Sequence, residues 1–350
     1  MRARLVVACL AAAVAAAPVL ADAPKVVTDI PAVHSLVVQV MGDRGTPLLL
    51  TERGANPHDM QLRPSQAAAL AEADLVIWIG PEMTPWLDRA MAGVGVKGHV
   101  LGLLAAEGTY RQDFGAAGDH DHDHDHGAKA EAGHSHGAGH SHGAGHSHGA
   151  GHSHGAAEGT AASAGHGHAH DHAGHSHEGV DPHAWLDPAN AQTWLALIAE
   201  ELAEHDPAGA AVYAANAAAA AERIEALDAR IAAMLRPVQG KPFVVFHDAY
   251  GYFAGHYGLT VAGSIALGDA AAPGAGRLAA LKAELQDGGA VCAFPEAQHD
   301  ARLVAAVTEG TGVRIGGTLD PSGTTMEPGP ALYEALLTGM AQTIADCLKN

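Results

Sequence analysis

Residues 206–237 read DPAGAAVYAANAAAAAERIEALDARIAAMLRP and predict one long helix. Asp206 followed by Pro207 is a typical helix start, and Pro237 ends the pattern. Apolar side chains in the second half recur at spacings of three and four residues, as expected for one buried face: Ile224, Leu227, Ile231 and Met234. Roughly 30 residues at about 1.5 Å each give about 45 Å, enough to cross a whole domain. We therefore predict a rigid linking helix over residues 206–236.

Short apolar stretches typical of buried strands lie on both sides of this helix and alternate with helical patterns. They cover residues 25–28, 48–50 and 74–80 before it and residues 243–246, 260–266 and 290–294 after it. Alternating strands and helices favour parallel sheets covered by helices. The predicted fold is α/β, with two lobes that each hold a largely parallel sheet flanked by helices. We place the N-terminal lobe at residues 22–205 and the C-terminal lobe at residues 237–350.

The first 21 residues have the pattern of a signal peptide. Arg2 and Arg4 precede an apolar stretch over residues 5–20, and small residues lead to an expected cleavage after Ala21. This alanine-rich stretch is too weakly apolar to favour a membrane anchor. The prediction is an exported mature chain without a transmembrane segment.

Residues 119–178 form a histidine-rich insertion in the predicted N-terminal lobe. Four copies of Gly-His-Ser-His-Gly-Ala fill residues 133–156, and bulky apolar residues are absent from the insertion, so we expect a flexible segment without a core of its own. Its imidazoles are candidates for weak, exchangeable metal sites. The candidate residues are His120, His122, His124, His126, His134, His136, His140, His142, His146, His148, His152, His154, His166, His168, His170, His172, His175 and His177.

The overall composition favours a protein that binds cations. The chain has 39 acidic and 19 basic residues, a formal net charge of −20, and 26 histidines. Such a surface repels phosphate backbones, which argues against nucleic acid as a partner. Histidine is the commonest metal ligand, so the composition favours metal binding.

Two cysteines remain after the predicted cleavage, because Cys9 lies in the signal peptide. In an oxidising compartment the pair Cys292 and Cys347 favours a disulfide, with two free thiols as the alternative.

Three histidines outside the insertion stand in polar, turn-like contexts. His58 follows the strand-like residues 48–50, His183 lies between two prolines, and His247 ends a buried strand. Ligands of open α/β sheets bind beyond the carboxyl ends of strands. Three neutral imidazoles suit Zn²⁺ or another borderline divalent metal. The spacing alone leaves a structural role open for each of them.

These residues also carry a resemblance. The chain resembles the substrate-binding proteins of bacterial high-affinity zinc ABC importers over nearly the whole mature length, the histidine-rich insertion included. The matching motifs are GANPHD (54–59), LRPS (62–65), ADLVIWIGPEM (73–83), DPHAWL (181–186), FHDAYGYF (246–253) and GTLDP (317–321).

The resemblance implies a zinc site in the cleft between the lobes, with His58, His183 and His247 as ligands. Manganese-binding relatives place a carboxylate where His247 stands, and imidazole there fits Zn²⁺ better. Asp320 matches an aspartate that is the fourth ligand in other members, with water as the alternative. Some relatives have a glutamate at the position of Pro57. The resemblance also supports the disulfide between the two cysteines.

The expected function is capture of Zn²⁺ in the periplasm, by a monomer, and delivery to the membrane permease of an ABC importer. The insertion would recruit or sense zinc. A metal store or chaperone that uses the insertion is one alternative, and a three-histidine zinc hydrolase is another. Against the hydrolase, the sequence lacks His-Glu-x-x-His and a general base placed beside the three histidines. Asp248 is the best candidate base, but its side chain is expected to cap the turn after His247. Glu296 is either a partner of the site or a solvated acid. The other histidines are expected in ordinary roles: His34, His99, His205, His256 and His299.

Overall fold

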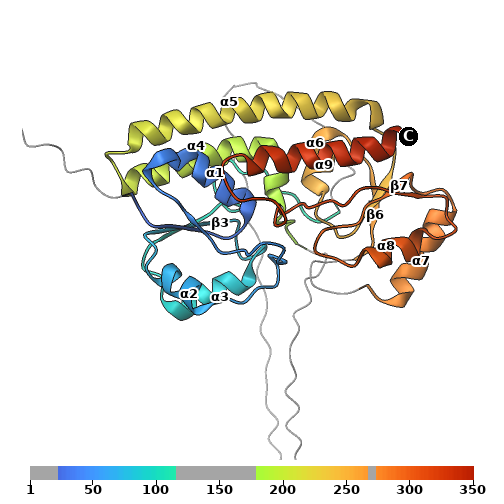
Figure 1. Cartoon of the computed structure of the whole chain (residues 1–350), viewed down its shortest axis with the longest axis horizontal. Helices are drawn as coiled ribbons and strands as arrows, with labels where there is room; N and C mark the ends of the chain where they lie inside the picture. The colour runs from blue at the N-terminus through green and yellow to red at the C-terminus, as the bar shows by residue number, and fades with distance from the viewer. Residues whose placement is uncertain (1–22, 116–178, 267–272) are drawn as a thin grey trace, which may run out of the picture. The chain divides into compact units, whose positions relative to one another are not determined.

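The computed structural model describes residues 23–115, 179–266 and 273–350 (Figure 1). The signal peptide predicted at residues 1–21 and the histidine-rich insertion at residues 119–178 lie outside the described residues. Within the described ranges, every helix is too short or too polar to cross a membrane.

The N-terminal sheet has four parallel strands in the order β2-β1-β3-β4. Alternate residues of its central strand β3 pack into two different apolar clusters, Leu75 and Ile77 into one and Val76 and Trp78 into the other. Because both faces are buried, helices cover both of them. Figure 1 shows α1 and α4 over one face and α2 and α3 over the other. The bounds are β1 Val26–Thr28, α1 Pro31–Met41, β2 Leu48–Leu49, α2 Pro64–Ala71, β3 Leu75–Trp78, α3 Pro85–Val94 and β4 His99–Gly102.

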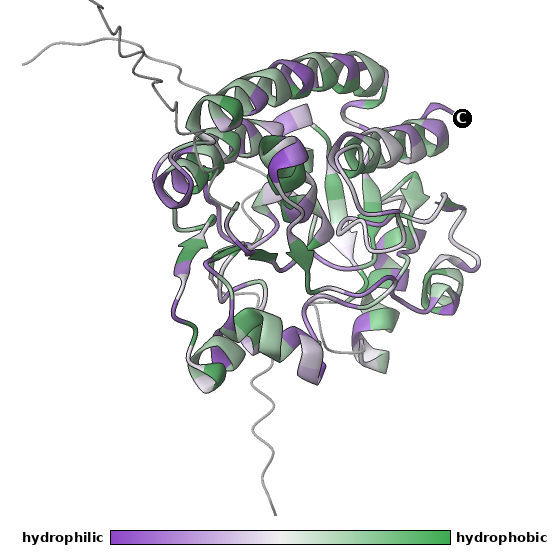
Figure 2. Ribbon diagram, turned by 60° about the vertical axis from the view of Figure 1, so that its left-hand side comes forward, coloured by the Kyte–Doolittle hydropathy of each residue, from purple (hydrophilic) through white to green (hydrophobic). Residues whose placement is uncertain are grey.

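The C-terminal sheet repeats this design, with four parallel strands in the order β6-β5-β7-β8. The two central strands β5 and β7 are buried, and Figure 2 shows hydrophobic residues on strands in the interior. The predicted α/β fold with two parallel sheets is therefore confirmed. The bounds are β5 Phe243–Val245, α6 Gly251–Tyr257, β6 Val261–Ser264, α7 Ala275–Gln286, β7 Cys292–Ala293, α8 Ala301–Thr308, β8 Arg314–Ile315 and α9 Leu332–Lys349.

The long helix is present as α5, Ala210–Leu235, with 26 residues. It begins four residues later than predicted, because Asp206 ends the preceding helix α4, Pro188–His205, instead of starting α5. The carboxylate of Asp206 accepts a hydrogen bond of 2.7 Å from the Tyr213 hydroxyl and pairs with Arg44 at 2.5 Å. These contacts hold it in the turn between the two helices. The predicted end of the helix, before Pro237, is confirmed.

The C-terminal helix α9 returns to the N-terminal half and packs against α1 and α5. Ser35 of α1 donates a hydrogen bond of 3.2 Å to the carbonyl of Pro330 and accepts one of 3.1 Å from the amide of Tyr333. The Tyr333 hydroxyl donates to the carbonyl of Trp185 at 2.8 Å. One apolar core therefore runs through both lobes, in addition to the linking helix.

The predicted disulfide between Cys292 and Cys347 is present. It joins β7, in the middle of the C-terminal sheet, to the last turn of α9. The sheet is thereby bonded covalently to the helix that reaches the N-terminal half.

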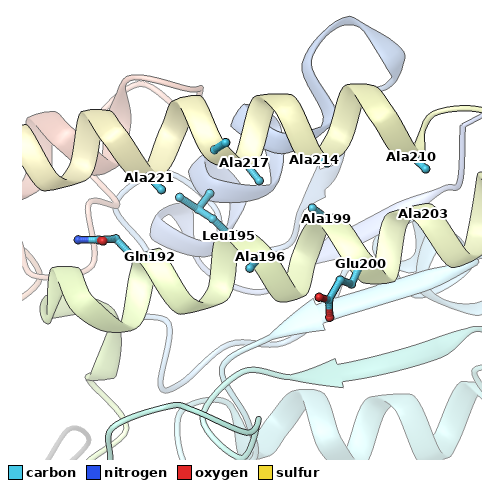
Figure 3. A pocket seen from close by; sticks show the side chains of 11 residues that line it. Gln192, Leu195, Ala196, Ala199, Glu200, Ala203, Ala210, Ala214, Ala217 and Ala221 are labelled. Atoms are coloured by element: carbon cyan, nitrogen blue, oxygen red, sulfur yellow. The ribbon is translucent and has the colours of Figure 1, made fainter. Parts of the chain in front are cut away.

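An apolar groove of about 470 Å³ lies between α4 and α5 (Figure 3). Alanines make up most of its lining, and Glu200 is its one charged side chain. A single carboxylate among alanines is not a metal-binding donor set.

His256 of α6 joins three helices through its ring. Its Nδ1 lies 3.0 Å from a carboxylate oxygen of Asp187, at the start of α4, and its Nε2 lies 2.9 Å from Asp228 of α5. Burial acts to lower the pKa of His256, but the two carboxylates outweigh it and raise the pKa to about 9. The imidazolium form thus stabilises the contact between the lobes.

This raised pKa predicts a loss of stability at alkaline pH. The contribution of His256 is complete below its ordinary pKa of 6.5 and disappears as the pH rises through about 9. The shift corresponds to about 3 kcal/mol at most. Urea unfolding of the metal-free protein between pH 6.5 and 9.5 tests this, with the His256→Gln variant as the reference. The two proteins should converge in stability as the pH rises, and a constant difference would contradict the assignment.

Candidate metal centre

The three histidines of the predicted site come from three separate loops at the ends of elements. His58 lies in the loop after β2, and His247 stands two residues beyond β5, at the carboxyl end of its sheet. His183 directly precedes the short helix η2, Ala184–Leu186. The two strands belong to different sheets, and each loop lies beyond the carboxyl end of its own strand, which is where ligands of open α/β sheets bind.

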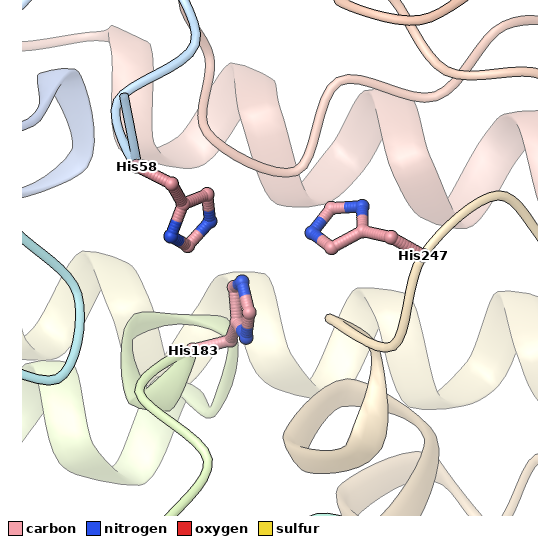
Figure 4. Close-up of side chains that lie close together, drawn as sticks. All are labelled: His58, His183 and His247. Carbon is pink, nitrogen blue, oxygen red and sulfur yellow. The ribbon is translucent and has the colours of Figure 1, made fainter. Parts of the chain in front are cut away.

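The structure brings these three side chains together (Figure 4). One ligand nitrogen from each lies within 4.8 Å of the other two. The ring centroids are separated by 5.3 Å for His58 and His183, 5.3 Å for His183 and His247, and 6.0 Å for His58 and His247. All three residues are buried. A tetrahedral zinc ion with bonds of about 2.0–2.1 Å holds its nitrogens about 3.4 Å apart, so small movements of the rings would complete a site.

Two of the rings have a carboxylate behind them. Nδ1 of His183 donates to Asp181 at 2.7 Å, and Nδ1 of His247 donates to Glu296 at 2.7 Å. A carboxylate can only accept, so these contacts assign the ring proton to Nδ1. Nε2 of each ring is then the nitrogen that would bind a metal ion, and Figure 4 shows a nitrogen of each ring facing the space between the rings. Such a carboxylate orients the ring and raises its basicity as a ligand.

Both carboxylates are themselves fixed by hydrogen bonds. Gln112 donates to Asp181 at 3.2 Å, and the hydroxyl of Tyr250 donates to Glu296 at 3.1 Å. Burial and the charge of Glu296 hold the pKa of Tyr250 well above its usual range, so Tyr250 remains a donor. The first residue of α6 has to be small here, because a Cβ on Gly251 would lie 3.0 Å from Asp181 and closer still to Gln112.

The loop that carries His58 is fixed from two sides. The side chain of Asn56 accepts a hydrogen bond of 3.0 Å from the amide of His58, forming a local turn. The indole of Trp86 donates to the carbonyl of Pro57 at 2.7 Å. Pro57 thus helps to support the loop that carries His58.

Asp320 is not part of the histidine group in the described residues. Its Oδ1 accepts hydrogen bonds from Gln298 at 3.0 Å and from the amide of Thr324 at 3.2 Å. Its Oδ2 accepts from the amide and the hydroxyl of Thr325, at 2.8 and 2.6 Å. These four bonds hold Asp320 in a turn in this structure, and its expected role as fourth ligand stays a prediction.

A family model described as "Zinc-uptake complex component A periplasmic" matches residues 26–347. The chain belongs to this family. Among curated members, the high-affinity zinc uptake system protein ZnuA of Paracoccus denitrificans is 54% identical over 334 residues, which cover 95% of this chain and 94% of that protein. The protein of the same name from Yersinia pestis is 32% identical and covers 87% of this chain and 84% of its own length.

Solved structures of zinc-uptake component A and related proteins share the fold. A crystal structure of ZnuA superposes with a TM-score of 0.67 at 22% identity, over 93% of this chain and 100% of that one. The periplasmic zinc-binding protein TroA from Treponema pallidum gives a TM-score of 0.67 at 18% identity, over 93% of this chain and 99% of that one.

Several contacts around this candidate metal centre were not predicted from the sequence. The contact of Asp181 with His183 was missed. An aspartate two residues before a candidate ligand histidine, as in Asp-Pro-His, is a signal that could have indicated it. For Glu296 the sequence left open whether it is a partner of the site or a solvated acid. In the structure it is 4% exposed and accepts a hydrogen bond from His247. His299 was expected in an ordinary role and lies 3.5 Å from Glu296, with its ring stacked on Phe246.

Replacing Glu296 by glutamine tests the role of the carboxylate behind His247. The amide keeps the shape but loses the charge that orients the ring, and we expect zinc affinity to fall by about 10–100-fold. The measurement is a competition titration with a zinc chelator below one equivalent of metal. Glu327→Gln is the control, because Glu327 is an exposed partner of Arg53. Equal affinities for both variants would contradict the role of Glu296.

Proposed function

We propose that this protein captures Zn²⁺ in the periplasm and delivers it to the membrane permease of an ABC importer. The observation that carries the proposal is the buried group of three imidazoles from both halves of the chain, two of them oriented by carboxylates. The names of the curated relatives, which are high-affinity zinc uptake proteins, support it.

The donor set favours zinc as the cargo. His58, His183 and His247 would supply three neutral nitrogens, which suit Zn²⁺ better than harder ions such as Mn²⁺. Because Asp320 is engaged in its turn, we propose water as the fourth ligand. A site with three protein ligands and one water keeps an open position through which zinc can be exchanged.

We propose that the exported chain works as a monomer after cleavage near Ala21. Zn²⁺ would enter the cleft between residues 22–205 and residues 237–350, which the long helix joins. The permease would then receive the ion from the loaded form.

Neither alternative has comparable support. The names of the relatives are those of transport proteins, which disfavours the zinc hydrolase. The buried histidine group is separate in sequence from the insertion, which disfavours a store that depends on the insertion alone.

Uptake of radioactive zinc tests the proposed function. Cells that lack this chain should take up zinc poorly at nanomolar external concentrations, and the intact chain should restore uptake. A chain with His58→Ala, His183→Ala and His247→Ala should fail although it is exported in equal amounts. Full restoration by this triple variant would refute the proposal.

The histidine-rich insertion has a separate expected effect. Deleting residues 119–178 should leave the one tight zinc site per chain and remove the weak sites of the insertion, because their imidazoles are lost with it. Calorimetric titration of the intact and deleted proteins measures both classes. Unchanged stoichiometry after the deletion would contradict a metal-binding role for the insertion.

A further inference from the structure

A second group of possible metal ligands lies in the N-terminal half, away from the three buried histidines. It consists of His99, the first residue of β4, and of Glu201 and His205 in the last two turns of α4. One ligand atom from each residue lies within 4.8 Å of the other two. Since the strands are parallel, the beginning of β4 is at the edge of the sheet opposite to the loop of His58.

The arrangement is built by the helix and completed by the strand. Glu201 and His205 are four residues apart, so their side chains lie on one face of α4. Oε1 of Glu201 contacts Nδ1 of His99 and lies 3.5 Å from Nε2 of His205. The Glu201 side chain is 12% exposed, whereas those of His99 and His205 are 57% and 29% exposed. A half-buried carboxylate thus stands between two imidazoles that solvent can reach.

The donor set and its dimensions fit zinc. Two histidines and one glutamate are a known combination of zinc ligands, with bonds of about 2.0–2.2 Å. Two ligands at such bond lengths around a tetrahedral ion lie about 3.4 Å apart, close to the 3.5 Å between Glu201 and His205. The His99 ring lies closer to Glu201 than two ligands of one ion do. Its exposure leaves space for the ring to turn outward and admit the ion.

The local charge also favours a cation. The carbonyl groups at the C-terminal end of α4 point toward this region and carry the negative end of the helix dipole. Glu200 and Glu204 on the same turns are exposed and add negative charge. The nearby guanidinium of Arg44 is paired with Asp206.

We propose that His99, Glu201 and His205 form a surface site for Zn²⁺ or a similar borderline divalent ion. The site binds more weakly than the buried histidine group, because its ligands are exposed and one ring has to move. Its open positions are filled by water, and the bound ion exchanges with the solvent. The proposal stands independently of the transport function.

Residue-resolved protection of histidines tests this in the full-length mature protein. Diethyl pyrocarbonate modifies accessible imidazoles, and mass spectrometry of the peptides reports His99 and His205 separately from the insertion. We expect zinc to protect both residues over the same concentration range. Glu201→Gln should raise the half-protecting zinc concentration at least about 10-fold, the lower end of what loss of even an indirect partner costs a metal site. Glu200→Gln, one residue away on the same helix, should leave it unchanged.

The same protection is expected in a chain with His58→Ala, His183→Ala and His247→Ala, which separates this site from the buried one. An anomalous difference map at the zinc edge, from crystals of the unsubstituted protein in excess zinc, should show a peak between the three side chains. Reactive His99 or His205 at saturating zinc, an unaltered Glu201→Gln variant, or an empty map would each overturn the proposal.

Discussion

Replacing His183 by alanine is expected to weaken binding of the first zinc ion by at least about 100-fold. His183 is fully buried, and its Nδ1 and backbone amide both donate to Asp181, at 2.7 and 3.0 Å. The substitution removes a proposed ligand, and loss of even an indirect partner already costs about 10–100-fold. Competition with a chelator at less than one equivalent of zinc measures the affinity of the tightest site, so that the weaker sites of the insertion do not contribute.

The control for this prediction is His34→Ala. His34 is also a buried histidine, but it lies on α1, and its ring contacts the carbonyl of Pro47 at 3.2 Å. Its loss should lower the stability of the protein without changing zinc affinity. Similar losses of zinc affinity in both variants would mean that His183 acts through the fold and not as a ligand.

Removal of the disulfide should lower the free energy of unfolding by about 4 kcal/mol. Cys292 and Cys347 are separated by 55 residues, and closing a loop of this size reduces the entropy of the unfolded chain by about that amount. Urea unfolding of the metal-free protein, with and without a thiol reductant, measures the difference.

A double variant with Cys292→Ala and Cys347→Ala serves as the control for the reductant. Its stability should match that of the reduced protein and should not respond to thiols. A reductant-dependent loss below about 1 kcal/mol in the unsubstituted protein would show that α9 is held by packing alone.

The buried strands were predictable because each is a short, continuous apolar run. Residues 243–246 are an example, and the polar His247 directly after them marks the carboxyl end where a ligand binds. The edge strands β4 and β8 were missed, since their residues are exposed or half-buried and make no apolar run. The start of α5 was misplaced because Asp206 is bonded to Arg44, which is distant in the sequence.

The histidine group could be predicted from local motifs and from the family resemblance, but its surroundings could not. Glu296 meets His247 only because β5 and β7 are neighbours in the sheet, and 49 residues separate the two side chains. The hydrogen bonds that Asp320 accepts from Thr324 and Thr325 were likewise not predicted. Pairings of this kind are set by the tertiary fold and leave no spacing signal in the chain.

The most direct test of the central claim is an anomalous difference map at the zinc absorption edge, from crystals of the mature protein loaded with one equivalent of Zn²⁺. The account predicts a single strong peak about 2.0–2.1 Å from one nitrogen each of His58, His183 and His247. A strong peak elsewhere, with these three side chains arranged as in the metal-free protein, would contradict it.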